Sequence, residues 1–431
     1  MPLITRAKSG SAGVVRPGSR GRAVYVADSG APRHLSGKFF LTADGASLRR
    51  RAFDTMAKVA NVRGLKNYIQ EIRNCSTKEQ EKERVDKELG KVRKKYTSDK
   101  AMSDYDKRKY MWKLLYTHML GYEVDFGHKQ AMDLIASSGY AEKQVGYVAC
   151  SIFLNEQDEF LRLVINSVRN DLISRNETFQ CLAFDFVSNV GGAEFSQLLT
   201  ADVIAVLGNG ATRPAVRKKA ALCLLRLLRK SPPDADLLPP EVWGVRLATL
   251  LEDRDLGVSL GLTTLLLGVV SRSYAGFEPC VPRVVAILER CRAREVPQDY
   301  TYYGLASPWL QTKCLRVLQY FPPPADPALL QSLTALLKKI LSGSESIKNV
   351  NKNNAVHAIV FEALSLALGL GDADLLALGA ALLARFLSVR EPNLRYLALV
   401  SLTRLAAVPV VAEALRRHAR AVRDCLRDPD V

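Results

Sequence analysis

Basic and aromatic residues alternate between residues 91 and 113, a combination that can bind phosphate groups. The stretch holds nine basic residues against three aspartates, with four aromatic residues among them. On a helix that begins near Tyr105 and is capped by Asp104, Lys109 and Lys113 share one face because they are four residues apart. Lysines in the first turns of such a helix oppose its dipole. This favours an anionic ligand, since a phosphate there would contact both the lysines and the free N–H groups of the helix.

The formal charge of +17 is concentrated at the beginning of the 431-residue chain. Residues 1–55 carry +7, residues 56–113 carry +8, and all later residues together carry +2. Charge this localised predicts an anionic partner, which could be lipid headgroups, nucleic acid or an acidic protein surface. A solvated basic helix end without a ligand is the alternative. Five or six basic residues near an anionic lipid surface supply roughly 5 kcal/mol, enough for reversible docking.

Nucleic acid competes with lipid as the predicted partner, because lysines contact phosphates while aromatic side chains stack on bases. Two observations weigh against it. The helix before the basic cluster also carries four glutamates, Glu79, Glu81, Glu83 and Glu88, and the rest of the chain is nearly neutral. A solenoid that binds nucleic acid is expected to carry basic residues along its whole length.

The sequence contains no motif that predicts catalysis, a cofactor or a metal site. It lacks a GxxxxGK[ST] loop, a GxGxxG turn after a strand and an HExxH zinc motif. A GxSxG pattern at residues 257–261 falls inside a predicted helix, whereas a nucleophile elbow follows a strand. His118 and His128 lack further ligands at metal-site spacing. We therefore expect a protein that binds rather than catalyses, without cofactor or metal.

From Asn61 onward the spacing of apolar residues predicts helices, and a short pattern repeats about every 40 residues. An apolar residue, mostly polar or small positions and then an apolar run begin at Val145, Phe179, Val216, Leu256, Leu310 and Leu394. This period is typical of HEAT or armadillo repeats, whose helix pairs stack to share a continuous core. The sequence therefore predicts an all-α, right-handed HEAT/armadillo-like solenoid of stacked helix pairs, with strands nearly absent.

Two further expectations concern the membrane and the domain boundaries. The longest uncharged apolar stretch, residues 256–271, has 16 residues, fewer than the roughly 20 that span a bilayer, so no transmembrane helix is expected. Residues 1–55 lack helical periodicity and are expected to be a disordered basic leader or a mispredicted gene start, with a transit peptide as the alternative. Residues 56–431 form the predicted solenoid, which is expected to be incomplete at its C-terminus.

Several stretches of the chain resemble the alpha-adaptins, the family of large alpha subunits of the plasma-membrane clathrin adaptor complex. The matching stretches are Arg63-Gly-Leu, residues 69–75, 125–128, 218–227, 299–303, 308–310, 320–324 and 393–399. The resemblance covers the chain from about Val62 to the C-terminus. The 299–303 segment, the triple proline at 322–324 and the Lys-Arg-Lys-Tyr run at 107–110 resemble the alpha subunits rather than the gamma subunit of the Golgi and endosomal adaptor.

The resemblance implies a phosphoinositide site within the same basic cluster. The implied site residues are Arg63, Gly64, Lys95, Tyr105, Lys107, Arg108, Lys109, Tyr110, Met111, Trp112 and Lys113. Lysine and arginine would neutralise the phosphates, tyrosine hydroxyls could hydrogen-bond to them, and Gly64 would let the backbone approach closely. Arg73 resembles an arginine beside the dileucine-type cargo-signal site that is formed mainly with the sigma subunit.

The resemblance also implies a non-enzymatic role in endocytosis. Alpha-adaptins assemble with beta, mu and sigma subunits, bind phosphatidylinositol 4,5-bisphosphate, capture cargo sorting signals and recruit clathrin. We therefore expect a clathrin adaptor subunit that moves between the cytosol and coated pits on the cytoplasmic face of the plasma membrane. By this resemblance we expect residues 1–431 to stop before the family's last trunk repeats, hinge and ear. The alternatives are the large subunit of a Golgi or endosomal coat adaptor and a nucleic-acid-binding or transport solenoid.

Overall fold

The computed structural model describes residues 62–98, 102–232, 235–293, 296–343, 349–406, 416, 418–425 and 427. The predicted leader, residues 1–55, lies outside the described residues, as does part of the C-terminal end. Within the described residues the chain forms eighteen α-helices and one two-stranded sheet. This confirms the predicted all-α class.

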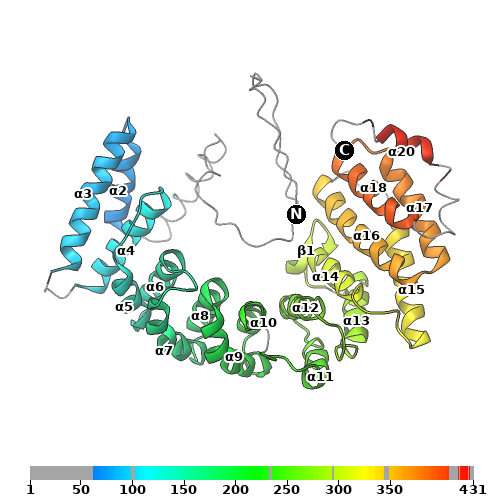
Figure 1. Cartoon of the computed structure of the whole chain (residues 1–431), viewed down its shortest axis with the longest axis horizontal. Coiled ribbons are helices and arrows are strands. Elements are labelled where there is room, and N and C mark those ends of the chain that lie inside the picture. The colour runs from blue at the N-terminus through cyan, green and yellow to red at the C-terminus, as the bar shows by residue number, and fades with distance from the viewer. Residues whose placement is uncertain are drawn as a thin grey trace, which may run out of the picture. The chain divides into compact units, whose positions relative to one another are not determined.

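The helices follow one another with short connections (Figure 1). Their bounds are α2 Arg63–Arg73, α3 Lys78–Tyr96, α4 Asp104–Met119, α5 His128–Ala136, α6 Tyr140–Phe153, α7 Phe160–Leu172, α8 Glu177–Val190, α9 Ala193–Gly208, α10 Pro214–Lys230, α11 Pro240–Leu250, α12 Leu256–Val270, α13 Cys280–Arg292, α14 Pro308–Leu318, α15 Pro327–Ser342, α16 Val350–Leu370, α17 Ala373–Leu387, α18 Pro392–Ala406 and α20 Ala419–Cys425. A 3₁₀ turn at Gln298–Tyr300 and strands β1 (Thr301–Tyr302) and β2 (Leu305–Ala306) separate α13 from α14.

The helices stack in two layers, as expected of a solenoid. Each even-numbered helix from α4 to α16 packs against the next even-numbered one, and the odd-numbered helices form the second layer. All six starting residues of the repeated pattern lie on even-numbered helices, from Val145 on α6 to Leu394 on α18. The pattern therefore marks one helix of each pair, and its apolar run packs on neighbours in its own layer and on its partner helix. The predicted solenoid of helix pairs is confirmed.

A short hairpin interrupts the repeats, which the sequence did not predict. Thr301 pairs with Ala306 and Tyr302 with Leu305 in an antiparallel register. Tyr303 and Gly304 form the turn with φ of 50° and 74°, the positive values that tight two-residue hairpin turns require. The turn pair is Tyr-Gly rather than Asn-Gly or Asp-Gly, which explains why the sequence signal was missed. The insertion also lengthens the spacing between Leu256 and Leu310.

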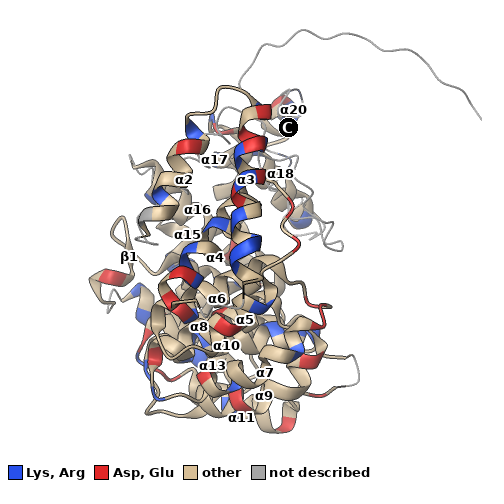
Figure 2. Cartoon of the chain, turned by 90° about the vertical axis from the view of Figure 1, so that its left-hand side faces the viewer, with Lys and Arg blue, Asp and Glu red and all other residues tan. Residues whose placement is uncertain are grey.

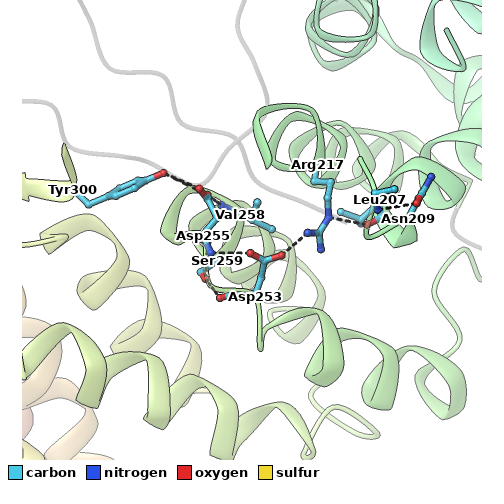
Figure 3. A network of polar contacts seen from close by, with 9 residues as sticks. Leu207, Asn209, Arg217, Asp253, Asp255, Val258, Ser259 and Tyr300 are labelled. Atoms are coloured by element: carbon cyan, nitrogen blue, oxygen red, sulfur yellow. Dashed lines mark hydrogen bonds and ion pairs between the residues drawn. The ribbon is translucent and has the colours of Figure 1, made fainter. Parts of the chain in front are cut away.

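Polar contacts hold the turn between α11 and α12 (Figure 3). Asp255 caps α12 by accepting the Val258 N–H at 2.9 Å, and the Tyr300 hydroxyl donates to the Asp255 carboxylate at 3.3 Å. Asp253 forms an ion pair with Arg217 of α10. Ser259 is fully buried within α12. The GxSxG letters at 257–261 thus lie on a helix, as expected, and Asp255 is a helix cap.

Among the residues that the structure describes, one helix, α16, is long and apolar enough to cross a membrane by length and composition alone. The sequence expectation of no transmembrane helix considered only uncharged stretches and passed over it, because Lys352 and Glu362 lie within α16. In the structure α16 packs against α14, α15, α17 and α18. About a third of the membrane-length window of α16 is buried, and Ile359, Val360 and Leu364 are among its buried apolar residues.

The loop before α13 approaches α11 so closely that Gly244 has no space for a side chain. A Cβ at Gly244 would lie 1.8 Å from the Gly276 carbonyl oxygen. We expect Gly244→Ala to lower the free energy of unfolding by about 1–3 kcal/mol, since one of two backbones must move. Gly90→Ala is the control, because nothing lies within 4 Å of a Cβ there, and it should stabilise α3 by about 0.5–1 kcal/mol. Urea denaturation measures both; equal midpoints would contradict the packing argument.

Candidate functional site

Helices α2, α3 and α4 frame the basic cluster. Thr77 caps α3 by accepting the Gln80 N–H. Helix α4 begins at Asp104, and the Ser103 hydroxyl accepts the Asp106 N–H at 3.2 Å. The prediction that Asp104 caps this helix is therefore wrong, because the chain turns into the helix one residue earlier. Helix α3 is unusually polar, and its buried residues are Val85, Glu88 and Val92.

A groove of about 660 Å³ lies between these three helices, and most of its charged lining residues are basic. Lys91, Lys94 and Lys95 of α3 form one wall, and Lys109 and Lys113 of α4 form the other. The remaining lining residues are Gly64, Asn67, Tyr68, Glu71, Arg84, Glu88, Ser98 and Tyr110. The lining therefore contains six basic and two acidic side chains. Figure 2 shows the basic residues of α3 and α4 in blue among acidic residues in red.

The stem of Lys109 packs on Gly64 of α2. A Cβ at Gly64 would lie 3.0 Å from Lys109 Cδ and 3.4 Å from Cγ, so the lysine stem packs closely against this glycine. The Lys109 ammonium pairs with Asp106 and lies 4.6 Å from the ring centre of Tyr110. Burial disfavours the charge of Lys109, but Asp106 and the neighbouring tyrosines outweigh it and raise its pKa. The hydrogen bond from Lys109 lowers the pKa of Asp106, so both groups stay charged at neutral pH.

Glu88 is the buried carboxylate of the groove, with 4 % of its surface exposed. It pairs with Lys113 of α4, and its Oε2 lies 2.8 Å from Arg84 Nη1 and 3.8 Å from Lys91 Nζ. Burial disfavours the charged form, but Lys113 and Arg84 outweigh it and lower the pKa of Glu88. Arg84 also pairs with Glu71 of α2. A chain of ion pairs thus joins all three helices of the groove.

Among the described residues, the positive charges of two groove lysines are not balanced by acidic partners. Lys94 and Lys95 are exposed, and neither takes part in an ion pair within the part of the chain that the structure describes. Ammonium groups on facing walls can donate hydrogen bonds to a ligand that carries several anionic oxygens. Phosphate esters have this chemistry, and a headgroup with more than one phosphate can reach both walls.

Only some of the site residues that the family resemblance implied line the groove. Gly64, Lys95, Lys109, Tyr110 and Lys113 meet in the groove.

The other implied residues lie outside the groove lining. Lys107 pairs with Asp104 at 3.4 Å, and Arg108 Nε lies 3.0 Å from Oε1 of Glu142 on α6. Tyr105 is 45 % exposed and stands beside Lys109. Lys107 and Arg108 can add to the positive field of a docked surface but do not line the groove.

Two implied residues belong to the core. Met111 is fully buried and Trp112 is 7 % exposed; they project from α4 away from the groove because successive helical residues point about 100° apart. They can support the helix but cannot contact a ligand in the groove. The side chain of Arg63 lies outside the described residues. Arg73 is exposed at the last position of α2 and is not part of the groove.

Arg84 was not predicted, and Lys91 and Lys94 were counted in the basic stretch 91–113 but were not among the residues that the resemblance implied. Glu88 was counted only as an argument against nucleic acid. A signal for three of these residues was present. Arg84, Glu88, Lys91 and Lys95 are spaced by four, three and four residues, which places them on one face of a helix. Without the position of α2 and α4, the sequence could not show which face of α3 they share with a ligand.

A larger cavity, of about 800 Å³, lies at the α7–α8 and α9–α10 turns, but its charges are largely balanced. Arg213 lies 3.5 Å from Glu177, and Asp202 lies 2.9 Å from Arg169. The excess of positive charge, rather than the volume, makes the groove of α2, α3 and α4 the better candidate for an anion-binding site.

Comparisons with known proteins agree with the resemblance. The adaptin N-terminal region matches residues 81–431. AP-2 complex subunit alpha-1 of Arabidopsis thaliana is 50 % identical over 375 residues, which cover 86 % of this chain and 37 % of the relative. AP-1 complex subunit gamma of Dictyostelium discoideum is 29 % identical over 371 residues, 85 % of this chain and 39 % of the relative. The chain thus spans less than half of the length of these relatives.

The fold also has a counterpart among known structures. A homology model of the full-length AP-3 complex in an intermediate open conformation aligns with 75 % of this chain and 55 % of that chain, with a TM-score of 0.50 and 18 % identity. At this identity the likeness shows a shared fold.

Proposed function

The chain belongs to the adaptin family and matches the N-terminal trunk of its alpha subunits, and from this premise we propose that it is a clathrin adaptor subunit that docks on phosphoinositides. The higher identity to the AP-2 alpha subunit than to the AP-1 gamma subunit favours the plasma-membrane adaptor over the Golgi and endosomal one. The partners proposed by this kinship are beta, mu and sigma subunits, cargo sorting signals and, indirectly, clathrin. The proposed location is the cytoplasmic face of the plasma membrane.

The observation that carries the lipid proposal is the groove with lysines on two facing walls. Phosphatidylserine presents a diffuse layer of single negative charges. Each lysine near such a surface contributes about 1 kcal/mol to binding. Phosphatidylinositol 4,5-bisphosphate offers two phosphates on one ring, and hydrogen bonds to charged groups contribute about 1.5–3 kcal/mol each. A groove that surrounds the headgroup on two sides therefore favours the bisphosphorylated lipid beyond its charge.

Vesicle flotation tests this proposal. We expect the full chain to float with phosphatidylcholine vesicles that contain phosphatidylinositol 4,5-bisphosphate, and to bind them at least about tenfold more tightly than phosphatidylserine vesicles of matched charge. Soluble inositol 1,4,5-trisphosphate should compete. Equal binding to the two lipids would contradict a phosphoinositide site. Competition by RNA far below the inositol phosphate concentration would support the nucleic-acid alternative.

A further inference from the structure

We infer that Glu88 is a positioning residue that gives the groove its selectivity for a multiply phosphorylated headgroup. This inference rests on the proposed function and deepens it, because it concerns how the same groove distinguishes one anionic lipid from another. An acidic side chain in an anion site normally weakens binding. Its burial among three cations indicates that its structural contribution exceeds that cost.

Ion pairs of Glu88 and Arg84 contribute to the position of α3 alongside a small apolar contact. Val85 and Val92 are its buried apolar residues, and Tyr96 packs edge-to-face against Tyr110 of α4 and against Phe126. The ion pairs of Glu88 with Lys113 and of Arg84 with Glu71 connect α3 to α4 and to α2. Because α3 carries Lys91, Lys94 and Lys95, these ion pairs fix the distance between the two lysine walls.

Glu88 also fixes the lysine on the opposite wall. The Lys113 side chain is 12 % exposed and paired with Glu88, and its ammonium lies 5.8 Å from the ring centre of Tyr68 and 5.9 Å from that of Tyr110. A lysine that is already held in place loses less side-chain entropy when it binds a phosphate. Lys113 has three donors, so donors remain for a ligand while one serves Glu88.

Removal of the Glu88 charge should therefore have opposite effects on two kinds of anionic membrane. The groove gains one unit of net positive charge, which strengthens diffuse attraction to any anionic surface. At the same time Lys113 and α3 lose their anchor, which weakens the directed contacts that a bisphosphorylated ring requires. If Glu88 contributes only charge, its removal should strengthen binding to both lipids. If Glu88 also positions Lys113 and α3, only binding to phosphatidylserine should become stronger.

The test compares flotation of the wild-type chain, Glu88→Gln, Glu88→Asp and Glu83→Gln on the two vesicle types of matched charge. Glu83 is the matched control because it is exposed on the same helix and does not line the groove. For Glu88→Gln we expect the preference for phosphatidylinositol 4,5-bisphosphate over phosphatidylserine to fall about tenfold, with equal or stronger phosphatidylserine binding. Glu83→Gln should change both affinities by the same factor. Inositol 1,4,5-trisphosphate should compete less well with Glu88→Gln than with wild type.

Glu88→Asp keeps the charge but withdraws the carboxylate by one carbon, so its preference should fall about threefold. Circular dichroism reports whether each variant is folded. If Glu88→Gln does not fold, the lipid preference of Glu88→Asp tests the inference instead. A folded Glu88→Gln that keeps the wild-type preference, or that behaves like Glu83→Gln, overturns this inference and leaves the proposed function intact. A wild-type chain without any preference overturns the proposed function and this inference with it.

Discussion

Replacement of Lys109 and Lys113 together by glutamine is expected to weaken binding to vesicles with phosphatidylinositol 4,5-bisphosphate about a hundredfold or more. Each lysine lines the groove and can donate to a phosphate, and hydrogen bonds between charged groups contribute about 1.5–3 kcal/mol each. Binding to phosphatidylserine of matched charge depends only on diffuse attraction, so it should fall less, by about thirtyfold at most. Quantitative flotation at constant ionic strength measures both.

Lys107→Gln with Arg108→Gln is the matched control for this pair. It removes the same charge from the same helix, but both residues are in ion pairs outside the groove, with Asp104 and Glu142. We expect it to reduce binding to the two lipids by the same factor, at most about thirtyfold. If the control abolished the preference for the bisphosphorylated lipid and the groove pair did not, the ligand would lie at the N-terminal turn of α4 instead.

The second large effect concerns stability. Asp171→Ala is expected to lower the free energy of unfolding by about 3–5 kcal/mol, because it leaves a buried lysine without its counter-charge. Lys143 Nζ donates to Asp171 Oδ2 at 2.9 Å and to the Ile135 carbonyl oxygen at 2.8 Å, and the Tyr147 hydroxyl donates to the same carboxylate oxygen at 2.7 Å. These contacts join α5, α6 and α7, and burial raises the pKa of Tyr147.

An exposed ion pair of the same type supplies the comparison. Asp185 on α8 pairs with Lys219 on α10 at 2.6 Å, and its side chain is 53 % exposed. Asp185→Ala should therefore cost no more than about 1 kcal/mol. Urea denaturation followed by circular dichroism gives the two midpoints. Equal shifts for both variants would show that burial does not amplify the Asp171 contacts.

Much of the fold could be predicted from the sequence because stacked helix pairs impose a period on the apolar residues. The repeated pattern identified helices of one layer correctly, from α6 to α18. The hairpin between α13 and α14 escaped prediction because its turn uses Tyr303 and Gly304, whose backbone conformation depends on surrounding contacts. The helix cap at Ser103 differed from the expected Asp104 because both residue types cap helices equally well.

The candidate groove was predictable in its location but only partly in its lining residues. Net charge and the alternation of lysine with tyrosine pointed to this part of the chain, and Lys109 and Lys113 lie on one face of α4, as their spacing predicted. Three consecutive basic residues, Lys107 to Lys109, point in different directions from a helix, and only the packing of α2 and α6 decides that Lys109 enters the groove. The role of Glu88 depends on partners that are distant in sequence.

The most direct test of the central claim is a crystal structure of the full chain with inositol 1,4,5-trisphosphate. The account predicts the ligand in the groove of α2, α3 and α4, with phosphate oxygens within hydrogen-bonding distance of Lys95, Lys109 and Lys113. A ligand bound at another basic surface, with the groove lysines still in contact only with their own acidic partners, would contradict it.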